Sequence, residues 1–398
     1  MELTITVSGA FIGSELSYIN GPLAITIEDG VIVSIERHVE GADLRGFIAL
    51  PPLANMHVHA LDLAIAEEGW DLDIDSVVGE PYGLKYTLLK RLSKDELSRA
   101  LESFYNYSLK CGVGLVVEFR EFGINGLKLG MRYGVNTYIM SMPSGHDVSI
   151  DELSKLIELS DGFGISSPLY FSDDVLRAML KLAKAKDKYV FAHIAEVKEV
   201  RDEGDLEKLL RFGNPTAIVH GVWLNSDDVV MLRERGIPLI LCPRSNRWFL
   251  SGDAKLDVIY REGIVVGLGT DNAGWVKPDL WRDAEEVLLR LRYLGINDPK
   301  WVLKALTVNA GTILGLRYEL SEGAKADILL LRNDLLMLGN VRNKYLAVVK
   351  RGGPELVGGV FVNGVLKYCS EEAKTLCSSL RNFISRRQDC FENRRFKA

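Results

Sequence analysis

The sequence predicts an α/β protein: a (β/α)8 TIM barrel with a small composite β-sandwich domain formed by both chain ends. Two patterns of apolar residues along the chain predict this architecture. Residues 51–319 alternate eight short apolar runs with amphipathic helical segments, whereas residues 1–50 and 320–369 contain short strands separated by turns. Eight strand–helix repeats are typical of a closed parallel barrel. The final stretch, 370–398, is expected to form a helix followed by a basic tail.

The two chain ends supply the expected strands of the small domain. Alternating apolar residues predict strands at 3–7, 23–27, 31–35 and 47–50, and again at 326–331, 346–349 and 357–366. The dipeptide Asp29-Gly30 and the dipeptide Asn363-Gly364 are expected at tight hairpin turns.

The middle of the chain supplies the expected barrel. Its eight predicted strands lie at 56–59, 115–119, 137–140, 162–165, 189–193, 217–220, 238–242 and 264–268. Helices are expected between them, for example at 94–109, 172–185 and 226–235, and several begin at a Ser or Asp suited to an N-cap. Enzymes with this fold place their active sites at the carboxyl ends of the strands.

The composition indicates an ordinary globular protein. Of 398 residues, 47% are hydrophobic and 26% are charged, and the formal net charge is -6. The mild acidity argues against nucleic acid or an anionic membrane as the main partner. Because the N-terminus lacks a basic region followed by an apolar run, and no apolar stretch reaches about 20 residues, we expect a cytoplasmic protein.

Two further features of the composition bear on its chemistry. The five cysteines form no CxxC pair, so a zinc ribbon and a thioredoxin-like motif are excluded. The single glutamine, Gln388, alongside many charged residues favours a thermophilic source. The expected partner is a small-molecule substrate, and a homo-oligomer stays open.

Histidines at strand ends point to a metal site. Of six histidines, four end predicted barrel strands, and Asp271 follows the eighth strand; the four are His57, His59, His193 and His220. Residues i and i+2 of a strand face the same side, so His57 and His59 are expected to face the barrel axis together. A lone histidine is more often a core residue, but imidazoles and a carboxylate at one open mouth suit zinc, with iron as the alternative. His38 and His146 are interpreted as ordinary surface or loop residues.

Glu196 follows His193 by three residues. One interpretation is a first-turn glutamate near a helix N-terminus, where a negative charge is mildly favourable. Its position beside the histidines favours the other interpretation, a general acid/base that acts on water at the metal.

Several motifs resemble those of the amidohydrolase superfamily. The segment 51–59, a proline-led strand that ends in His57-Val58-His59, is similar to the opening of that superfamily. The remaining motifs resemble those of the chlorohydrolase and aminohydrolase branch of this superfamily, and they occur in the order found in that family. They are 218–224, Cys242-Pro243-Arg244-Ser245-Asn246, Gly267-Leu268-Gly269-Thr270-Asp271 and Thr307-Val308-Asn309-Ala310-Gly311. That branch holds S-adenosylhomocysteine, guanine and cytosine deaminases and triazine hydrolases.

The resemblance implies a single-metal hydrolase. By the family pattern, His57, His59, His193 and Asp271 would bind one divalent metal, while Glu196, His220 and Asp271 would act in catalysis. Binuclear members carry a carboxylated lysine at the end of strand 4, where this chain has Ile165-Ser166-Ser167-Pro168. The implied activity is deamination of a nucleobase-like or related heterocyclic or amidine compound by metal-activated hydroxide. Hydrolysis of an amide or C–Cl bond at the same site, or a non-catalytic scaffold, are the alternatives.

Residues near the strand ends are candidates for substrate binding. The set consists of Trp70, Glu80, Arg120, Glu121, Arg244, Asn246 and Trp275. Aromatic rings would suit a flat heterocycle, and arginine a carboxylate or phosphate. Other interpretations are that Arg120 pairs with Glu121 and that the tryptophans anchor loops.

Overall fold

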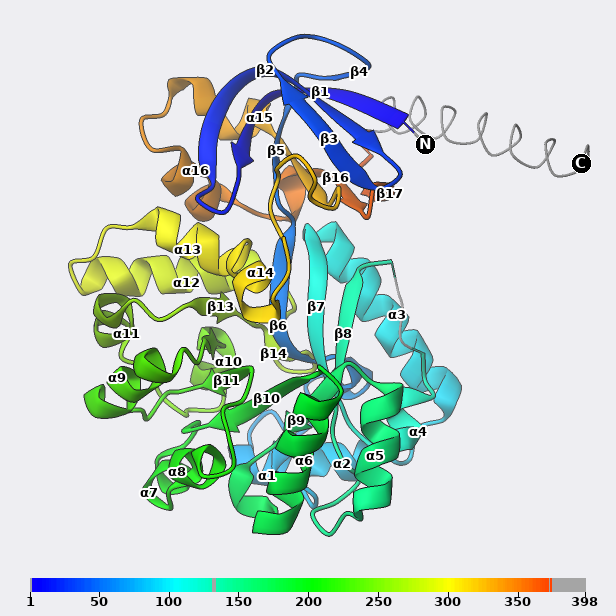
Figure 1. The fold of residues 1–398 in the computed structure, drawn as a ribbon, viewed down its shortest axis with the longest axis vertical. Coiled ribbons are helices and arrows are strands. Elements are labelled where there is room, and N and C mark those ends of the chain that lie inside the picture. Colours follow the sequence, from blue (N-terminus) through cyan, green and yellow to red (C-terminus); the bar gives the residue numbers. More distant parts are fainter. Residues whose placement is uncertain (1, 131–133, 372, 374–398) are drawn as a thin grey trace, which may run out of the picture.

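The computed structural model describes residues 2–130, 134–371 and 373. Figure 1 shows a small sheet built from the two chain ends at one end of the molecule and a strand barrel surrounded by helices at the other. The predicted C-terminal helix and basic tail over 370–398 lie, apart from 370, 371 and 373, outside the described residues.

Parallel strands form the barrel, and their positions match the eight predicted runs. They are β6 (Leu53–His59), β7 (Val113–Arg120), β8 (Asn136–Ser141), β9 (Gly162–Ile165), β10 (Tyr189–Ile194), β11 (Ala217–His220), β12 (Leu239–Leu241), β13 (Val266–Leu268) and β14 (Asp271–Asn272). Neighbours in the sheet follow the order β13-β12-β11-β10-β9-β8-β7-β6-β14. Because β13 and β14 are successive parts of one extended segment, pairing of β14 with β6 closes the barrel, and the predicted fold class is confirmed.

Two local features hold this closure. The side-chain amide of Asn55 donates to Thr270 Oγ1 over 2.8 Å, and the Thr270 N–H donates to Asn55 Oδ1 over 3.0 Å. Gly269 has no side chain between the strands, where a Cβ would lie 2.8 Å from the Cβ of His57. Glycine is therefore required at 269 for the eighth strand to approach the first at the level of His57.

Helices and short 3-10 turns follow the barrel strands. Their bounds are η1 (Ala60–Ile65), α1 (Ile74–Val78), α2 (Leu84–Leu89), α3 (Lys94–Lys110), α4 (Gly123–Leu127), α5 (Ile150–Leu159), η2 (Pro168–Tyr170), α6 (Asp173–Ala185), α7 (Lys198–Asp202), α8 (Asp205–Leu210), α9 (Ser226–Arg235), α10 (Pro243–Trp248), α11 (Leu256–Glu262), α12 (Leu280–Tyr293), α13 (Pro299–Leu306) and α14 (Asn309–Leu314). The predicted helices at 94–109, 172–185 and 226–235 are confirmed. Ser93 and Asn225 each form a capping box, and Ser172 caps α6.

The small sheet joins the two ends of the chain. Its strands are β1 (Glu2–Ile12), β2 (Ser17–Glu28), β3 (Val31–Glu36), β4 (Ala42–Leu44), β5 (Phe47–Leu50), β15 (Ile328–Arg332), β16 (Val357–Val362) and β17 (Val365–Cys369). In the order β17-β16-β15-β5-β1-β2-β3, with β4 beside β1, β5 from the N-terminal part of the chain pairs with β15 from the C-terminal part. Positive φ angles at Asp29, Gly30, Asn363 and Gly364 confirm the two tight turns.

One predicted strand, 346–349, is wrong: these residues belong to the helix α16 (Lys344–Arg351). The Asn343 side chain caps this helix by accepting from the Leu346 N–H over 2.9 Å. Ala347, Val348 and Val349 are buried in the core that also contains barrel residues. A short apolar run does not by itself distinguish a strand from a buried helix, and here the cap and the packing decide for the helix. The other late elements are α15 (Asn333–Leu336), η3 (Leu338–Asn340) and η4 (Pro354–Leu356).

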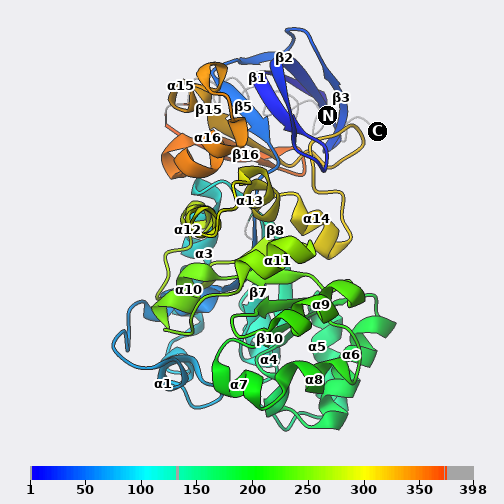
Figure 2. The same ribbon diagram turned by 90° about the vertical axis from the view of Figure 1, so that its left-hand side faces the viewer.

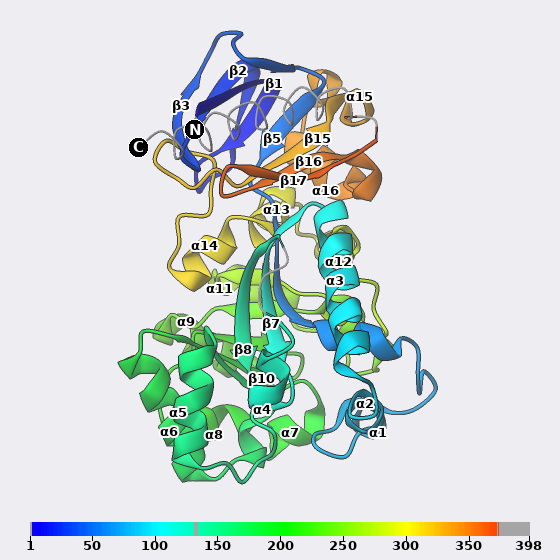
Figure 3. The same ribbon diagram turned by 90° about the vertical axis from the view of Figure 1, so that its right-hand side faces the viewer.

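The barrel mouth lies away from the small sheet. Figure 3 shows α1 and α2, which follow the end of β6, on the side of the barrel opposite the small sheet, and Figure 2 shows α1 on that side in another view. None of the helices in the described part of the chain has the length and apolar character to cross a membrane.

Candidate metal centre and active site

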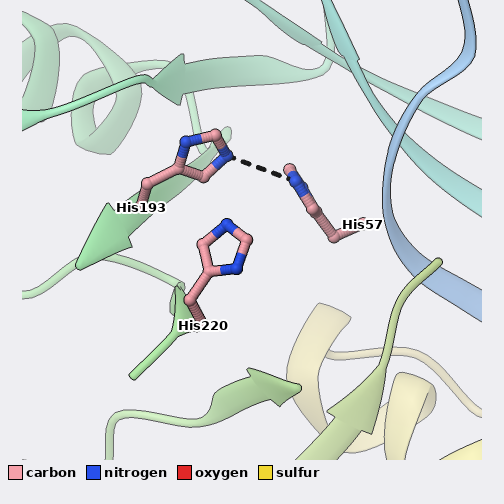
Figure 4. A group of neighbouring side chains, drawn as sticks. All are labelled: His57, His193 and His220. Atoms are coloured by element: carbon pink, nitrogen blue, oxygen red, sulfur yellow. Dashed lines mark hydrogen bonds between the residues drawn. The ribbon is translucent and has the colours of Figure 1, made fainter. Parts of the chain in front are cut away.

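Four strand ends bring imidazoles and one carboxylate together at the barrel mouth. His57 Nε2 lies 3.2 Å from Asp271 Oδ1 and 3.2 Å from His193 Nε2. His59 Nε2 lies 3.8 Å from Asp271 Oδ1. The ring centroids of His193 and His220 are 4.9 Å apart, and Figure 4 shows His57, His193 and His220 facing a common space.

The backbone is strained where these side chains turn into the mouth. His220 has a φ of 73°, Asp271 of 60° and Ala195 of 52°, all in the left-handed region. A non-glycine residue held there costs about 1–3 kcal/mol, and such residues gather at functional sites. All three positions fall at or just beyond the carboxyl end of a barrel strand, so the strain coincides with the convergence of the polar side chains.

Burial keeps two of the imidazoles neutral. Burial lowers the pKa of His57 to about 4, against the opposing attraction of Asp271. Burial, together with the neighbouring histidines, lowers the pKa of His193 well below its ordinary value. Burial by itself would raise the pKa of Asp271, but the hydrogen bond and charge of His57 outweigh it and hold that pKa well below its ordinary value. Neutral imidazoles and an ionised carboxylate are the forms that bind metal ions.

The donor set fits a divalent metal. Two groups of side chains, His57 with His59 and Asp271, and His57 with His193 and His220, place their ligand atoms within 4.8 Å of one another. The second oxygen of Asp271, Oδ2, is held by Ser245 Oγ over 2.7 Å and by Asn272 Nδ2 over 2.9 Å, so Oδ1 faces the histidines. Nitrogen ligands with one carboxylate suit zinc and related first-row metals.

Glu196 and His220 lie next to this cluster. Glu196 Oε2 is 3.5 Å from His220 Nε2, and His220 Nδ1 is 2.8 Å from Asn246 Oδ1. Burial raises the pKa of Glu196, against the attraction of His220. A carboxyl group with a raised pKa, next to an imidazole, is suited to proton transfer near neutral pH.

The cluster opens into one cavity at the barrel mouth. The lining residues are His59, Ile74, Asp75, Val78, Gly79, Glu80, Lys85, Tyr86, Met142, Ser166, Ser167, Tyr170, His193, Ala195, Glu196, Val197, Val200, His220, Asp271 and Asn272. Tyr86 and Tyr170 add aromatic surface, and Lys85 is the sole Lys or Arg in this lining. Burial raises the pKa of Glu80, against a hydrogen bond from the Ser166 side chain.

The predicted substrate residues divide into three groups. Glu80 lines the cavity. Asn246 contacts His220, and Glu121 contacts His59, so these two lie behind the histidines. The remaining four do not line the cavity: Trp70, Arg120, Arg244 and Trp275.

Local contacts explain why those four lie elsewhere. Arg120 is fully buried and donates to Glu118 Oε1 over 2.5 Å, rather than pairing with Glu121. Arg244 donates to Asp283 Oδ2 over 2.6 Å. Trp275 is an anchor of the loop after β6, because its indole N–H donates to the Glu68 carbonyl over 2.9 Å, and Trp70 is 68% exposed.

The two histidines left out of the predicted site lie outside the cluster. His38 is a surface residue that contacts Glu40 over 2.8 Å. His146 lies in a loop and stacks on Tyr170 with ring centroids 4.7 Å apart.

Several cavity residues were not predicted from the sequence: Lys85, Tyr86, Ser166 and Tyr170. Residues 46–84 contain no lysine or arginine, so Lys85 is the first cation after a long acidic and apolar stretch. This isolated position in the sequence could have identified Lys85 as a candidate site residue. The tyrosines follow no pattern, because α2 and η2 reach the cavity only through the tertiary fold.

Comparisons with known proteins identify the family of the chain. The profile of the amidohydrolase family matches residues 48–367. A putative aminohydrolase of Methanothermobacter thermautotrophicus is 26% identical over 86% of this chain and 93% of its own length. A 5-methylthioadenosine/S-adenosylhomocysteine deaminase of Acetivibrio thermocellus is 25% identical over 93% of this chain and 91% of its own.

A solved structure shares the fold. An adenosine deaminase of Xanthomonas campestris with bound zinc superposes with a TM-score of 0.78 at 18% identity, covering 96% of this chain and 98% of that one. The resemblance inferred from the strand-end motifs is confirmed.

Proposed function

The chain belongs to the amidohydrolase family of C–N hydrolases, and on that premise we propose that it is a metal-dependent deaminase of a nitrogen heterocycle. The observation that carries the proposal is the pairing, in one cavity, of a His/Asp ligand cluster with a glutamate of raised pKa. The deaminases among the relatives support the reaction class.

The proposed cofactor is one zinc ion held by His57, His59, His193 and Asp271. Strand β9 is followed by Ser166 and Ser167, which line the cavity where a second metal would need a bridging lysine. Zinc in a solved structure of the same fold supports the choice of metal. When bound, zinc supplies Lewis acidity that lowers the pKa of water from about 15.7 towards about 7.

The chain's own residues would carry the proton transfers. Water adds its oxygen to the ring carbon that bears the amino group. Glu196 takes one proton from that water and delivers it to a ring nitrogen. His220, whose Nδ1 is held by Asn246, accepts a hydrogen bond from the attacking water at Nε2. The second water proton goes to the departing amine, so that ammonia leaves and a carbonyl remains.

The lining of the cavity favours a flat substrate without an anionic group. Tyr86 and Tyr170 offer aromatic surface suited to a heterocycle. Asp75 and Glu80 place carboxylates at the cavity, whereas the ammonium of Lys85 is already paired with two other carboxylates. Hydroxyl or amino groups of a substrate would hydrogen-bond to Glu80 and Ser166, which both line the cavity.

Ammonia release tests the proposal. The zinc-loaded protein is incubated with purine nucleosides and bases, pyrimidines, pterins and guanidino compounds, and ammonia is measured by a coupled assay. Release from at least one heterocycle, with loss of one amino group by mass spectrometry, is the expected result. Hydrolysis of amide or chloro analogues without ammonia release from any amino-heterocycle would contradict the proposed reaction.

A further inference from the structure

A buried chain of charged groups runs behind one of the proposed metal ligands. Glu121 Oε1 lies 2.6 Å from His59 Nδ1 and accepts a hydrogen bond from Lys85 Nζ over 2.9 Å. The same ammonium group lies 3.2 Å from Asp62 Oδ1. All four side chains are at most 4% exposed. We call Asp62, Lys85, Glu121 and His59 the His59 relay.

The relay is assembled from four elements or their ends. His59 ends β6 and Asp62 lies in the following turn η1, while Glu121 directly follows β7 and Lys85 lies in the first turn of α2. No two of these elements contain all four side chains. The ammonium group therefore ties the α2 segment to the ends of the first two barrel strands.

A gain in overall stability does not explain why these charged side chains are buried together. Removing an ammonium and two carboxylates from water is costly, and buried ion pairs seldom stabilise a protein more than apolar residues of the same volume. Burial would by itself raise the pKa of Glu121, but the charges of Lys85 and His59 outweigh it and hold that pKa below its ordinary value. Glu121 is thus an ionised acceptor fixed against the imidazole.

The geometry gives the relay a specific task. An ionised carboxylate only accepts hydrogen bonds, so the contact at 2.6 Å places a proton on Nδ1 in the neutral imidazole that binds a metal. The lone pair is then on Nε2, the atom that faces Asp271 Oδ1 at 3.8 Å. Carboxylates that hold the second nitrogen of a metal-bound histidine fix its tautomer and increase its basicity.

We propose that Glu121 and Lys85 are positioning residues that set the metal affinity of the centre by fixing His59, with Asp62 anchoring Lys85. This inference rests on the metal site of the proposed function. Within the described ranges, His59 is the only one of the three ligand histidines whose Nδ1 contacts a carboxylate.

Metal affinity is the decisive measurement, because it does not depend on turnover. The metal-free wild-type protein and the variants Glu121→Gln and Lys85→Met are titrated with zinc in competition with a chromophoric chelator. We expect zinc affinity to fall about 10- to 100-fold in each variant. Because both residues act through one imidazole, the double variant should bind zinc about as weakly as the weaker single variant.

A matched control lies beside the same strand. The Tyr105 hydroxyl donates to Glu118 on β7, a buried polar contact that does not touch the histidines. Tyr105→Phe should therefore leave zinc affinity within about twofold of wild type, because losing a buried hydrogen bond away from the histidines should not by itself lower zinc affinity. Circular dichroism and melting of the metal-free proteins identify any variant that fails to fold. The cobalt-loaded variants add an independent readout, because a reoriented His59 changes the visible absorption bands.

The outcomes separate the two proposals. Unchanged zinc affinity and unchanged cobalt spectra in folded Glu121→Gln and Lys85→Met would overturn the positioning role. A raised KM in Lys85→Met with wild-type zinc affinity would overturn it too and assign Lys85 to the substrate. If the wild-type protein itself binds no zinc, the proposed metal site is overturned, and with it the positioning role of Glu121 and Lys85.

Discussion

His220, which ends β11, and Asn246, which lies in α10, form a hydrogen bond with 2.8 Å between Nδ1 and Oδ1. The amide oxygen only accepts, so Nδ1 carries a proton and Nε2 is directed to the cavity, 3.5 Å from Glu196. Asn246 follows β12 and is buried, and this contact fixes the one histidine of the cluster that is proposed to act on substrate.

Asn246→Ala should lower kcat about tenfold or more, because His220 loses the partner that fixes its ring, an effect of the size seen for supporting hydrogen bonds. Zinc content should stay at the wild-type level. Steady-state kinetics and metal analysis check both statements. Asn214→Ala, which removes an amide that contacts Arg235 at the surface, is the control. Equal kcat values for the two variants would contradict a role for Asn246.

Glu196→Gln should retain zinc and lose turnover by about 10²- to 10⁴-fold, because the amide keeps the volume but cannot take a proton. The exposed Glu199, three residues along the same segment, supplies the control Glu199→Gln, which should keep wild-type activity. Single-turnover rates on a confirmed substrate are the measurement. A fully active Glu196→Gln would refute the proton transfer.

Removal of metal should abolish ammonia release and lower the melting temperature. A ligand at 100 times its Kd stabilises the folded state by about 2.7 kcal/mol, so zinc-loaded protein should melt higher than metal-free protein. Dialysis against a chelator, followed by calorimetry and reconstitution with zinc or iron, provides the test. Activity that survives complete metal removal would exclude the proposed cofactor.

Neutral substrates should be preferred to phosphorylated ones. The cavity presents Asp75 and Glu80, and its only ammonium group is already paired, so a phosphate would meet uncompensated negative charge. For a nucleoside substrate, kcat/KM should exceed that of its 5′-monophosphate at least about tenfold, a difference of about 1.4 kcal/mol. Comparable values for the two would show that another group compensates the phosphate.

Cys111 and Cys242 should resist alkylation in the native protein at pH 8. Burial raises the pKa of Cys111 to about 12 and that of Cys242 well above its ordinary value, so neither presents a thiolate. Mass spectrometry after iodoacetamide treatment should find both residues unmodified before denaturation and modified after it. Rapid native labelling of either would show that the core opens at that position.

Local patterns predicted the larger part of this structure. The alternation of apolar runs and capped helices located the barrel strands, and the strand-end positions of His57, His59, His193, His220 and Asp271 placed them at one mouth. Prediction succeeded there because strand periodicity fixes the side to which a side chain points, and a parallel barrel collects all carboxyl ends at one face.

The same patterns failed for side chains that were predicted to face the cavity but are held elsewhere by a specific contact. Arg120 ends a strand at the mouth, yet its guanidinium group is held by Glu118. Trp275 follows the last strand, yet its indole anchors a loop through the Glu68 carbonyl. Neither partner can be identified from spacing alone, because each contact depends on the path of a loop.

The sequence by itself determined the barrel, the composite sheet and the set of side chains that converge at the mouth, because these follow from short-range periodicity. Only the tertiary structure decided which of the neighbouring charged residues face the cavity. Lys85 and Glu121 meet His59 because α2, β6 and β7 converge, and the cost of burying their charges is offset only when all of them are in contact.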